Sequence, residues 1–184
     1  MLLVLFYNKN RRVLATGNMR SGKGYRIKRF LLILAIAILA IAGTMTSPAF
    51  ALEYNEEFLI GADFSNRDLK DASFTRAKLQ QSNFSHSDLR GVSLFGAHLE
   101  KANLEGADLS YAVIGQVLFL KANLTNTILE GAFAPNARFN GATIDGADFT
   151  DVMLRDEQYE MLCQVAKGTN PVTGRDTRDT LNCP

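Results

Sequence analysis

The stretch that decides the fold is Ala102-Asn-Leu-Glu-Gly-Ala-Asp-Leu-Ser-Tyr111, two consecutive copies of a five-residue unit. Each copy places a small residue two positions before a large apolar one. The same phase runs from Phe64 to Leu154, where 18 of 19 central positions are Phe, Leu or Ile and only Ala134 is small. Ala stands two positions earlier in 12 of the 19 units. A phase held over this length indicates a repeat protein.

A period of five matches neither the turn of a helix nor the alternation of a flat strand, so the chain must bend once in every unit. If each unit forms one side of a square, four units make a coil, and coils stack at the strand spacing of about 4.8 Å. Nineteen units predict an all-β solenoid of just under five coils. Phe and Leu would fill its axis, with Ala where a larger side chain would overfill the core.

The units resemble a known family. Ala102-Asn-Leu-Glu-Gly106 and Ala147-Asp-Phe-Thr-Asp151 are similar to the A(D/N)LXX pattern of the pentapeptide-repeat superfamily, and the resemblance covers residues 62–155. It implies a right-handed quadrilateral β-helix. It implies no single activity, because members of that superfamily serve different roles.

Residues 1–51 have the pattern of a signal peptide. Lys28 and Arg29 precede an uncharged run over residues 30–42, and Ala49-Phe50-Ala51 follows. This apolar run is shorter than the roughly 20 residues of a membrane-spanning helix. We expect cleavage after Ala51; the alternatives are retention as an uncleaved anchor and a true start at Met19.

The charge is divided unevenly along the chain. Residues 1–51 hold eight of the 20 Lys and Arg residues and none of the 19 Asp and Glu residues, so residues 52–184 carry a net charge of −7. An acidic domain repels phosphate backbones at long range, which counts against nucleic acid as a partner.

Cys163 and Cys183 are the only two cysteines. In an exported protein they allow a single pairing, and a bridge closing a loop of about 20 residues stabilises by roughly 3 kcal/mol. The alternative is two free buried thiols. His86 and His98 lie far upstream of both cysteines, so we predict no metal site.

The two ends of a coil stack need covering, because they expose unpaired backbone groups. At the C-terminal end we predict a short amphipathic helix over residues 156–166, with Asp156 as its N-cap, within a disulfide-tied tail at 156–184. At the front we predict an N-terminal cap over residues 52–61. An extra degenerate unit centred on Leu59 is the alternative.

Catalytic residues are not predicted. His86 and His98 occupy outward positions on different sides of the coil, where a solvated histidine is the simpler interpretation. The aspartates that precede central residues suit turn hydrogen bonds rather than acid and base pairs. Serines lack a paired base, and no glycine-rich loop precedes a helix, so we predict no cofactor.

Outward positions on one side of the coil break the polar pattern. With 20 residues a coil, the side that includes Ile114 and Ala134 carries apolar residues that stack, and two leucines continue the area around the next corner. Such a patch usually marks a contact surface. The candidate contact residues are Phe95, Val113, Leu118, Leu120, Phe133, Pro135 and Met153.

Two alternatives remain open for this patch. Ala134 is the one undersized central position, and Phe133 would fill the core if it swung inward. The second alternative is coverage of the patch by the N-terminal segment.

The function that these patterns favour is a non-catalytic, exported interaction scaffold. The tail from Cys163 to Cys183 and the signal peptide resemble the lumenal pentapeptide-repeat proteins of cyanobacteria and chloroplasts, which implies the thylakoid lumen or the periplasm. We expect a monomer that binds an unidentified protein, with no nucleic acid and no membrane after cleavage. The alternative is a DNA-mimicking topoisomerase binder, and an enzyme is a third class that no convergent polar site supports.

Overall fold

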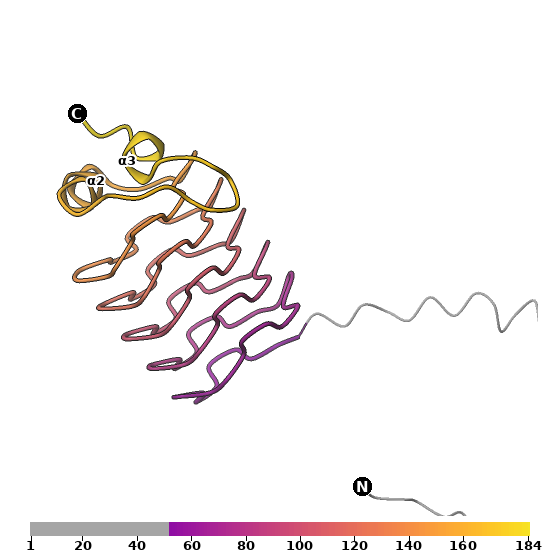
Figure 1. Ribbon diagram of the computed structural model, residues 1–184. Coiled ribbons are helices and arrows are strands. Elements are labelled where there is room, and N and C mark those ends of the chain that lie inside the picture. Colours follow the sequence, from indigo (N-terminus) through magenta and orange to yellow (C-terminus); the bar gives the residue numbers. More distant parts are fainter. Residues whose placement is uncertain (1–51) are drawn as a thin grey trace, which may run out of the picture. The chain divides into compact units, whose positions relative to one another are not determined.

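A computed structural model describes residues 52–184, which form a stack of square coils followed by two short helices (Figure 1). Helix α2 spans Asp156–Cys163 and helix α3 spans Thr177–Thr180. Neither helix in this part of the chain is long and apolar enough to cross a membrane. The predicted signal peptide, its cleavage after Ala51 and the alternative start at Met19 lie outside the described residues.

Successive coils pair through parallel bridges between residues 20 apart. The ladder begins with Glu53 and Ser73 and recurs at every fifth residue up to Phe133 and Met153. Bridged positions therefore span 21 units, which makes just over five coils rather than the predicted just under five. Because the chain bends in every unit, pairing within residues 52–184 consists of isolated bridges rather than longer strands.

The extra units lie at the front. Residues 52–61, predicted to be a separate N-terminal cap, instead form two more units centred on Tyr54 and Leu59. Glu53 and Phe58 bridge to the next coil, and the Tyr54 ring stacks on that of Phe74 with centroids 4.7 Å apart. The alternative of an extra degenerate unit centred on Leu59 is therefore confirmed, and a further unit centred on Tyr54 precedes it. The sequence indicated a separate cap because the small residue of the repeat is missing from both units.

Each unit bends at the second residue after its central one. From Glu56 to Asp151, every fifth residue has a positive φ, between +55° and +70°. The next residue's amide then donates to the central carbonyl, as Ala62 N does to Leu59 O at 3.1 Å. Glycine adopts this left-handed conformation without strain, but Lys101 and other L-residues also adopt it at these corners.

The core runs along the axis of the stack. Central Phe and Leu side chains from Phe64 to Phe149 are almost fully buried, and most of the Ala residues two positions earlier are buried with them. The rings of Phe64 and Phe84 stack at 4.9 Å. Where Ser82 replaces Ala, its buried hydroxyl donates to Leu79 O at 2.7 Å, so the polar atom keeps a partner.

We name the four sides for their outward side chains. The apolar side is centred on Tyr54, Phe74, Leu94, Ile114, Ala134 and Leu154, and the basic side follows it, centred on Leu59, Leu79, Leu99, Phe119 and Phe139. Next come the amide side, centred on Phe64, Phe84, Leu104, Leu124 and Ile144, and the acidic side, centred on Leu69, Leu89, Leu109, Leu129 and Phe149.

Helix α2 is shorter than predicted. It ends at Cys163 rather than Ala166, and its N-cap is Arg155, which makes no side-chain cap hydrogen bond, rather than Asp156. After Cys163 the chain leaves the helix because it pairs with the last coil: Gly146 N donates to Lys167 O at 2.8 Å.

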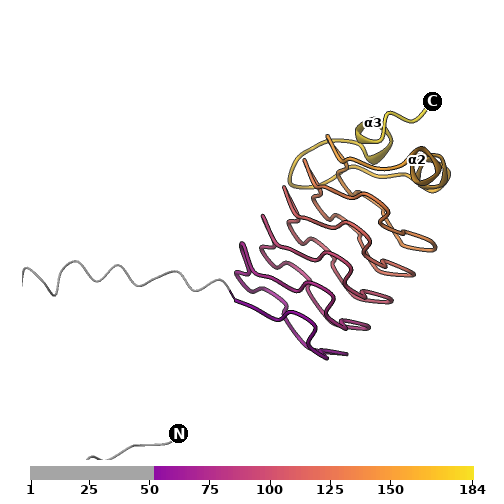
Figure 2. The ribbon, with the colours of Figure 1, turned by 180° about the vertical axis from the view of Figure 1, so that it is seen from behind.

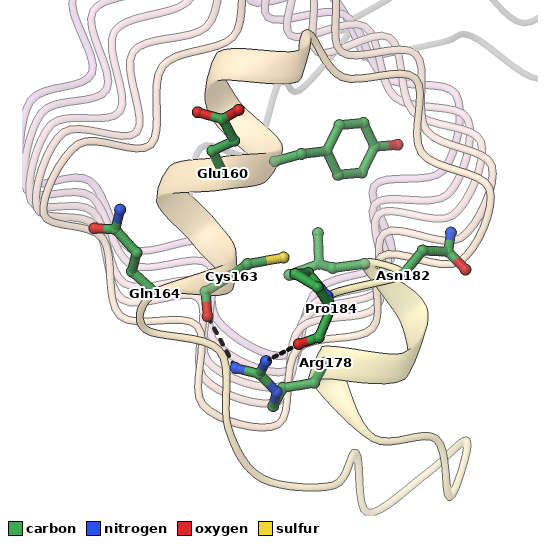
Figure 3. Close-up of a pocket in the computed structure, with 8 residues that line it drawn as sticks. Glu160, Cys163, Gln164, Arg178, Asn182 and Pro184 are labelled. Carbon is green, nitrogen blue, oxygen red and sulfur yellow. Dashed lines mark hydrogen bonds between the residues drawn. The ribbon is translucent and has the colours of Figure 1, made fainter.

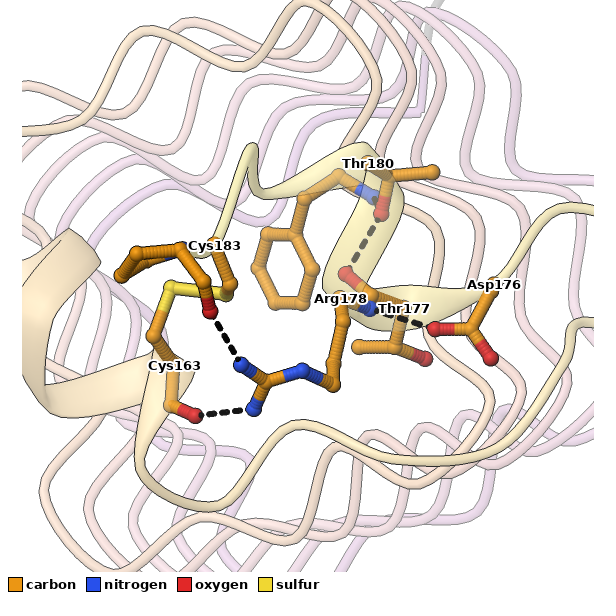
Figure 4. The surroundings of a disulfide bond; sticks show 8 residues. Cys163, Asp176, Thr177, Arg178, Thr180 and Cys183 are labelled. Atoms are coloured by element: carbon orange, nitrogen blue, oxygen red, sulfur yellow. Dashed lines mark hydrogen bonds between the residues drawn. A yellow bond between two sulfur atoms is a disulfide. The ribbon is translucent and has the colours of Figure 1, made fainter.

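The C-terminal segment makes further hydrogen bonds to the last coil, against which it lies in both views (Figures 1 and 2). Tyr159 Oη donates to Val152 O at 2.7 Å, and Phe149 N donates to Thr180 Oγ1 at 3.1 Å. The predicted disulfide between Cys163 and Cys183 is present and ties α2 to the residues after α3 (Figure 4).

Candidate contact surface

Three outward residues of the apolar side form a continuous ladder. Val113 bridges to Phe133, and Phe133 bridges to Met153, so their side chains project from neighbouring coils at the strand spacing. They are 37%, 46% and 63% exposed, respectively. The structure therefore brings three of the predicted contact residues together as one exposed apolar row.

Phe133 points outward. Its neighbour Ala134 is buried in the core, whereas nearly half of the Phe133 side chain is exposed. Side chains on either side of a central residue face away from the axis in every unit, and the small Ala134 does not change this. The alternative in which Phe133 fills the core is wrong.

A second row on the same side is packed more tightly. Phe95 and Pro135 are half-buried and lie two coils apart with Gly115 between them. A β-carbon on Gly115 would lie 3.2 Å from Phe95 Cδ2 and 3.3 Å from Pro135 Cγ. The rings of Phe95 and Pro135 thus both pack against Gly115. Phe95 contributes mainly packing beneath the apolar surface, because much of its side chain is buried.

Leu118 and Leu120 lie around the corner, on the basic side. Both are half-buried, and Leu118 sits in the ladder between His98 and Arg138. The predicted contact residues therefore occupy two adjacent sides that meet at the Gln116 corner.

Tyr111, at the corner between the acidic and apolar sides, is a further exposed aromatic residue that the sequence analysis did not select. It is a corner residue with φ +59° and is 67% exposed. Its ring lies over Gly131 one coil later, where a β-carbon would meet Tyr111 Cδ1 at 2.8 Å. The sequence does carry a pattern that would have identified Tyr111: an aromatic residue at a corner position, followed by glycine at the corner position 20 residues later.

The polar side chains of the described residues do not converge on a reaction centre. No group of three or more His, Cys, Asp and Glu side chains in residues 52–184 could hold a metal ion. His98 Nδ1 lies 3.3 Å from Glu100 Oε1 on the outside of the stack, whereas His86 lies against Gly106 at another corner.

A cavity of about 690 Å³ lies beside the disulfide, between α2 and the residues around α3 (Figure 3). Arg178 lines it, but its guanidinium donates to Cys163 O at 3.0 Å and to Pro184 O at 2.9 Å. These bonds tie the tail together, as Figure 4 also shows. The lining residues are Tyr159, Glu160, Cys163, Gln164, Arg178, Leu181, Asn182 and Pro184.

Carboxylates on the acidic side are paired with cations of the same side. Arg90 lies 2.6 Å from Asp88 Oδ2 and 3.7 Å from Asp108 Oδ2, and Lys70 lies 3.1 Å from Asp68. The hydrogen bonds from Arg90 lower the pKa of Asp88 to about 2. Three carboxylates and two cations therefore form a ladder of ion pairs along this side.

One carboxylate on this side is fully buried. Arg175 Nε, from the C-terminal segment, lies 3.1 Å from Asp148 Oδ2, and the same guanidinium pairs with Glu130. Burial would raise the pKa of Asp148, but hydrogen bonds from Thr150 and the Arg175 charge lower it overall. The pair therefore joins the tail to the last coils by charge as well as by backbone hydrogen bonds.

Comparison with known proteins confirms the predicted resemblance. The family model described as pentapeptide repeats matches residues 59–94, 87–117 and 119–156, in eight copies. A solved structure of a pentapeptide-repeat protein from the Arabidopsis thaliana thylakoid lumen is 43% identical in sequence, with a TM-score of 0.57. The match covers 72% of this chain and 86% of that chain, and the likeness implies a right-handed β-helix.

Two curated proteins of Arabidopsis thaliana match shorter segments. Thylakoid lumenal 15 kDa protein 1, chloroplastic, is 60% identical over 48 residues, which cover 26% of this chain and 21% of that protein. Thylakoid lumenal protein TL20.3, chloroplastic, is 54% identical over 43 residues, covering 23% and 15%. The matched segments thus span less than a quarter of the length of these curated relatives.

Proposed function

Because the chain belongs to the pentapeptide-repeat family, we propose that it is a non-catalytic protein-interaction module of the thylakoid lumen. The observation that carries this proposal is the exposed apolar row of Val113, Phe133 and Met153 on a rigid, fully packed core. Exposed apolar rows of this kind mark protein contact sites more often than chance. The β-helix then acts as the frame that holds the row in place.

The lumenal location is supported by the relatives. The solved structure and both curated relatives compared above are named for the thylakoid lumen. The signal-peptide pattern at residues 1–51 and the disulfide between Cys163 and Cys183 both suit a compartment outside the cytosol. The periplasm, which the sequence alone left open, has no comparable support among these relatives.

The C-terminal segment serves as the cap of the solenoid in this proposal. Its hydrogen bonds to Gly146, Phe149 and Val152 satisfy backbone groups that would otherwise end the stack unpaired. Leu162 of α2 is buried in the same core cluster as the coils. A capped end would keep the protein from growing by edge pairing, in line with the expected monomer.

A DNA-mimicking role finds less support. A mimic needs unpaired carboxylates along one side, whereas Asp88 and Asp108 on the acidic side are paired with Arg90. The row of Val113, Phe133 and Met153 lies on the apolar side, which meets the acidic side at a corner of the coil.

To test location and binding together, the full chain is expressed with an affinity tag in the organism from which the sequence comes. We expect the processed protein in the lumenal fraction, with a specific protein recovered alongside it. A variant with Phe133→Ser and Met153→Ser should lose that protein, while Val172→Ser, which changes a residue 78% exposed outside the row, should retain it. Recovery from the cytosol, or the same protein with all three forms, would contradict the proposal.

A further inference from the structure

The cations of the domain are distributed unevenly around the coil. Residues 52–184 carry a net charge of −7, but six Lys and Arg side chains form neither an ion pair nor a side-chain hydrogen bond within that range. One of them, Arg67, lies over the Phe64 ring at 5.5 Å, where the amide and acidic sides meet, and the other five lie on the apolar and basic sides or at their corners. These five cations are Lys78, Lys101, Lys121, Arg138 and Arg155.

Four of the five lie on the basic side or at its far corner, and Arg155 lies on the apolar side itself. Arg138 follows Leu118 in the same ladder, and Arg155 occupies the position one coil beyond Pro135. Lys101 and Lys121 project from the far corner of the basic side, where both have positive φ and are exposed. The apolar side, which carries Val113, Phe133 and Met153, therefore meets the basic side and its unpaired cations at the Gln116 corner.

The basic side carries fewer acidic residues than cations. The units of the basic side contain the carboxylates of Glu57 and Glu100 and four cations, which are Lys78, Lys101, Lys121 and Arg138. Asp151 lies at the opposite corner of the apolar side, toward the acidic side. The units of the basic side thus carry an excess of two positive charges, opposite in sign to the net charge of the whole domain.

We propose that this surface binds a protein segment in which apolar side chains are followed on one flank by carboxylates. The inference rests on the proposed function and names the chemistry of the partner. The apolar side chains of the segment would cover Phe133 and Met153, and its carboxylates would reach Arg138 and Lys121. Such charge complementarity fixes the orientation of the partner and speeds association.

A protein segment fits this surface better than an anionic membrane does. The apolar and cationic parts lie on two sides that meet at a corner, so a flat bilayer cannot contact both at once. The net charge of −7 also repels an anionic bilayer as a whole, whereas a short acidic segment meets mainly the local field.

The test measures binding of three synthetic peptides to the purified protein by fluorescence anisotropy. The peptides share one amphipathic Leu and Phe pattern and carry Glu, Gln or Lys on the same flank. Vesicles of anionic phospholipid form a fourth arm. We expect the Glu peptide to bind at least about tenfold tighter than the Lys peptide, with a preference that weakens as salt screens the charges.

Variants separate the two parts of the surface. Arg138→Glu combined with Lys121→Glu should reverse the preference, while Lys167→Glu, remote from the surface and paired with Asp145, should leave it unchanged. Equal binding of the three peptides, or binding to the vesicles in their place, would overturn the inference. If partner capture still depends on Phe133 and Met153 in that case, the proposed function stands and only the charge preference fails.

Discussion

Gly168 packs so closely on Gly146 that a β-carbon at residue 168 would lie 3.0 Å from Gly146 N. Gly168 also has φ +82°, and its carbonyl accepts a hydrogen bond from Thr177 N at 3.0 Å. The seam between the C-terminal segment and the last coil therefore depends on the absence of a side chain at this point.

We predict that Gly168→Ala lowers the free energy of unfolding by about 2 to 3 kcal/mol, because left-handed strain adds to a backbone clash. Gly174 is the matched control, since it has φ +70° but open space around its α-carbon. Gly174→Ala should cost about 1 kcal/mol, from strain alone. Urea unfolding of both variants checks this, and equal losses would mean that the seam is not close-packed.

The disulfide should stabilise the tail in particular. Replacing Cys163 and Cys183 by Ser opens a loop of sequence separation 20 and should cost about 3 kcal/mol. The amides of Gly146 and Phe149 donate to the tail, so their hydrogen exchange should speed up more than that of Phe84, which lies in the middle of the stack. Uniform acceleration at all three amides would contradict a role confined to the C-terminal end.

The buried pair of Asp148 and Arg175 predicts a pH-dependent effect. Arg175→Gln should cost about 2 kcal/mol at neutral pH, because it leaves a buried carboxylate without its cation. The exposed pair of Lys167 and Asp145, 3.2 Å apart, is the control, and Lys167→Ala should cost less than about 0.5 kcal/mol.

The sign of the pH dependence follows from the lowered pKa of Asp148. A carboxyl with a lowered pKa in the fold stabilises it above its unfolded pKa of about 3.9, and this contribution is lost as the pH falls through the folded pKa. Without Arg175, one of the causes that lower the pKa of Asp148 is lost, so its folded pKa moves up toward the unfolded value. The loss in free energy of unfolding caused by Arg175→Gln should therefore become smaller below about pH 4. A loss that stays constant down to low pH would contradict the pairing of Asp148 with Arg175.

The core residues of this structure could be predicted from the sequence because they recur with a strict period of five. The phase that places Phe84 and Leu104 on the axis is visible without any structure, and with it the four sides of the coil. Tyr54 was missed as a central residue because Leu52 replaces the small residue of its unit, so that only tertiary pairing identifies the unit.

Other features depend on contacts that no local pattern encodes. The Tyr111 ring lies where it does because Gly131, one coil later, has no side chain to collide with it. The pair of Asp148 and Arg175 joins the last full coils to a tail whose path the sequence does not specify. Helix α3, with Asp176 accepting from Arg178 N at its start, is too short for a periodic signal.

The central claim is that the row containing Phe133 and Met153 is a contact surface, and site-specific photo-cross-linking tests it most directly. A benzophenone side chain would replace Met153 or, as control, Val172 in the full chain; these residues are 63% and 78% exposed. We predict one dominant cross-linked protein from position 153, lost when Phe133→Ser is added, and none from position 172. No product from position 153, or the same product from both positions, would contradict the claim.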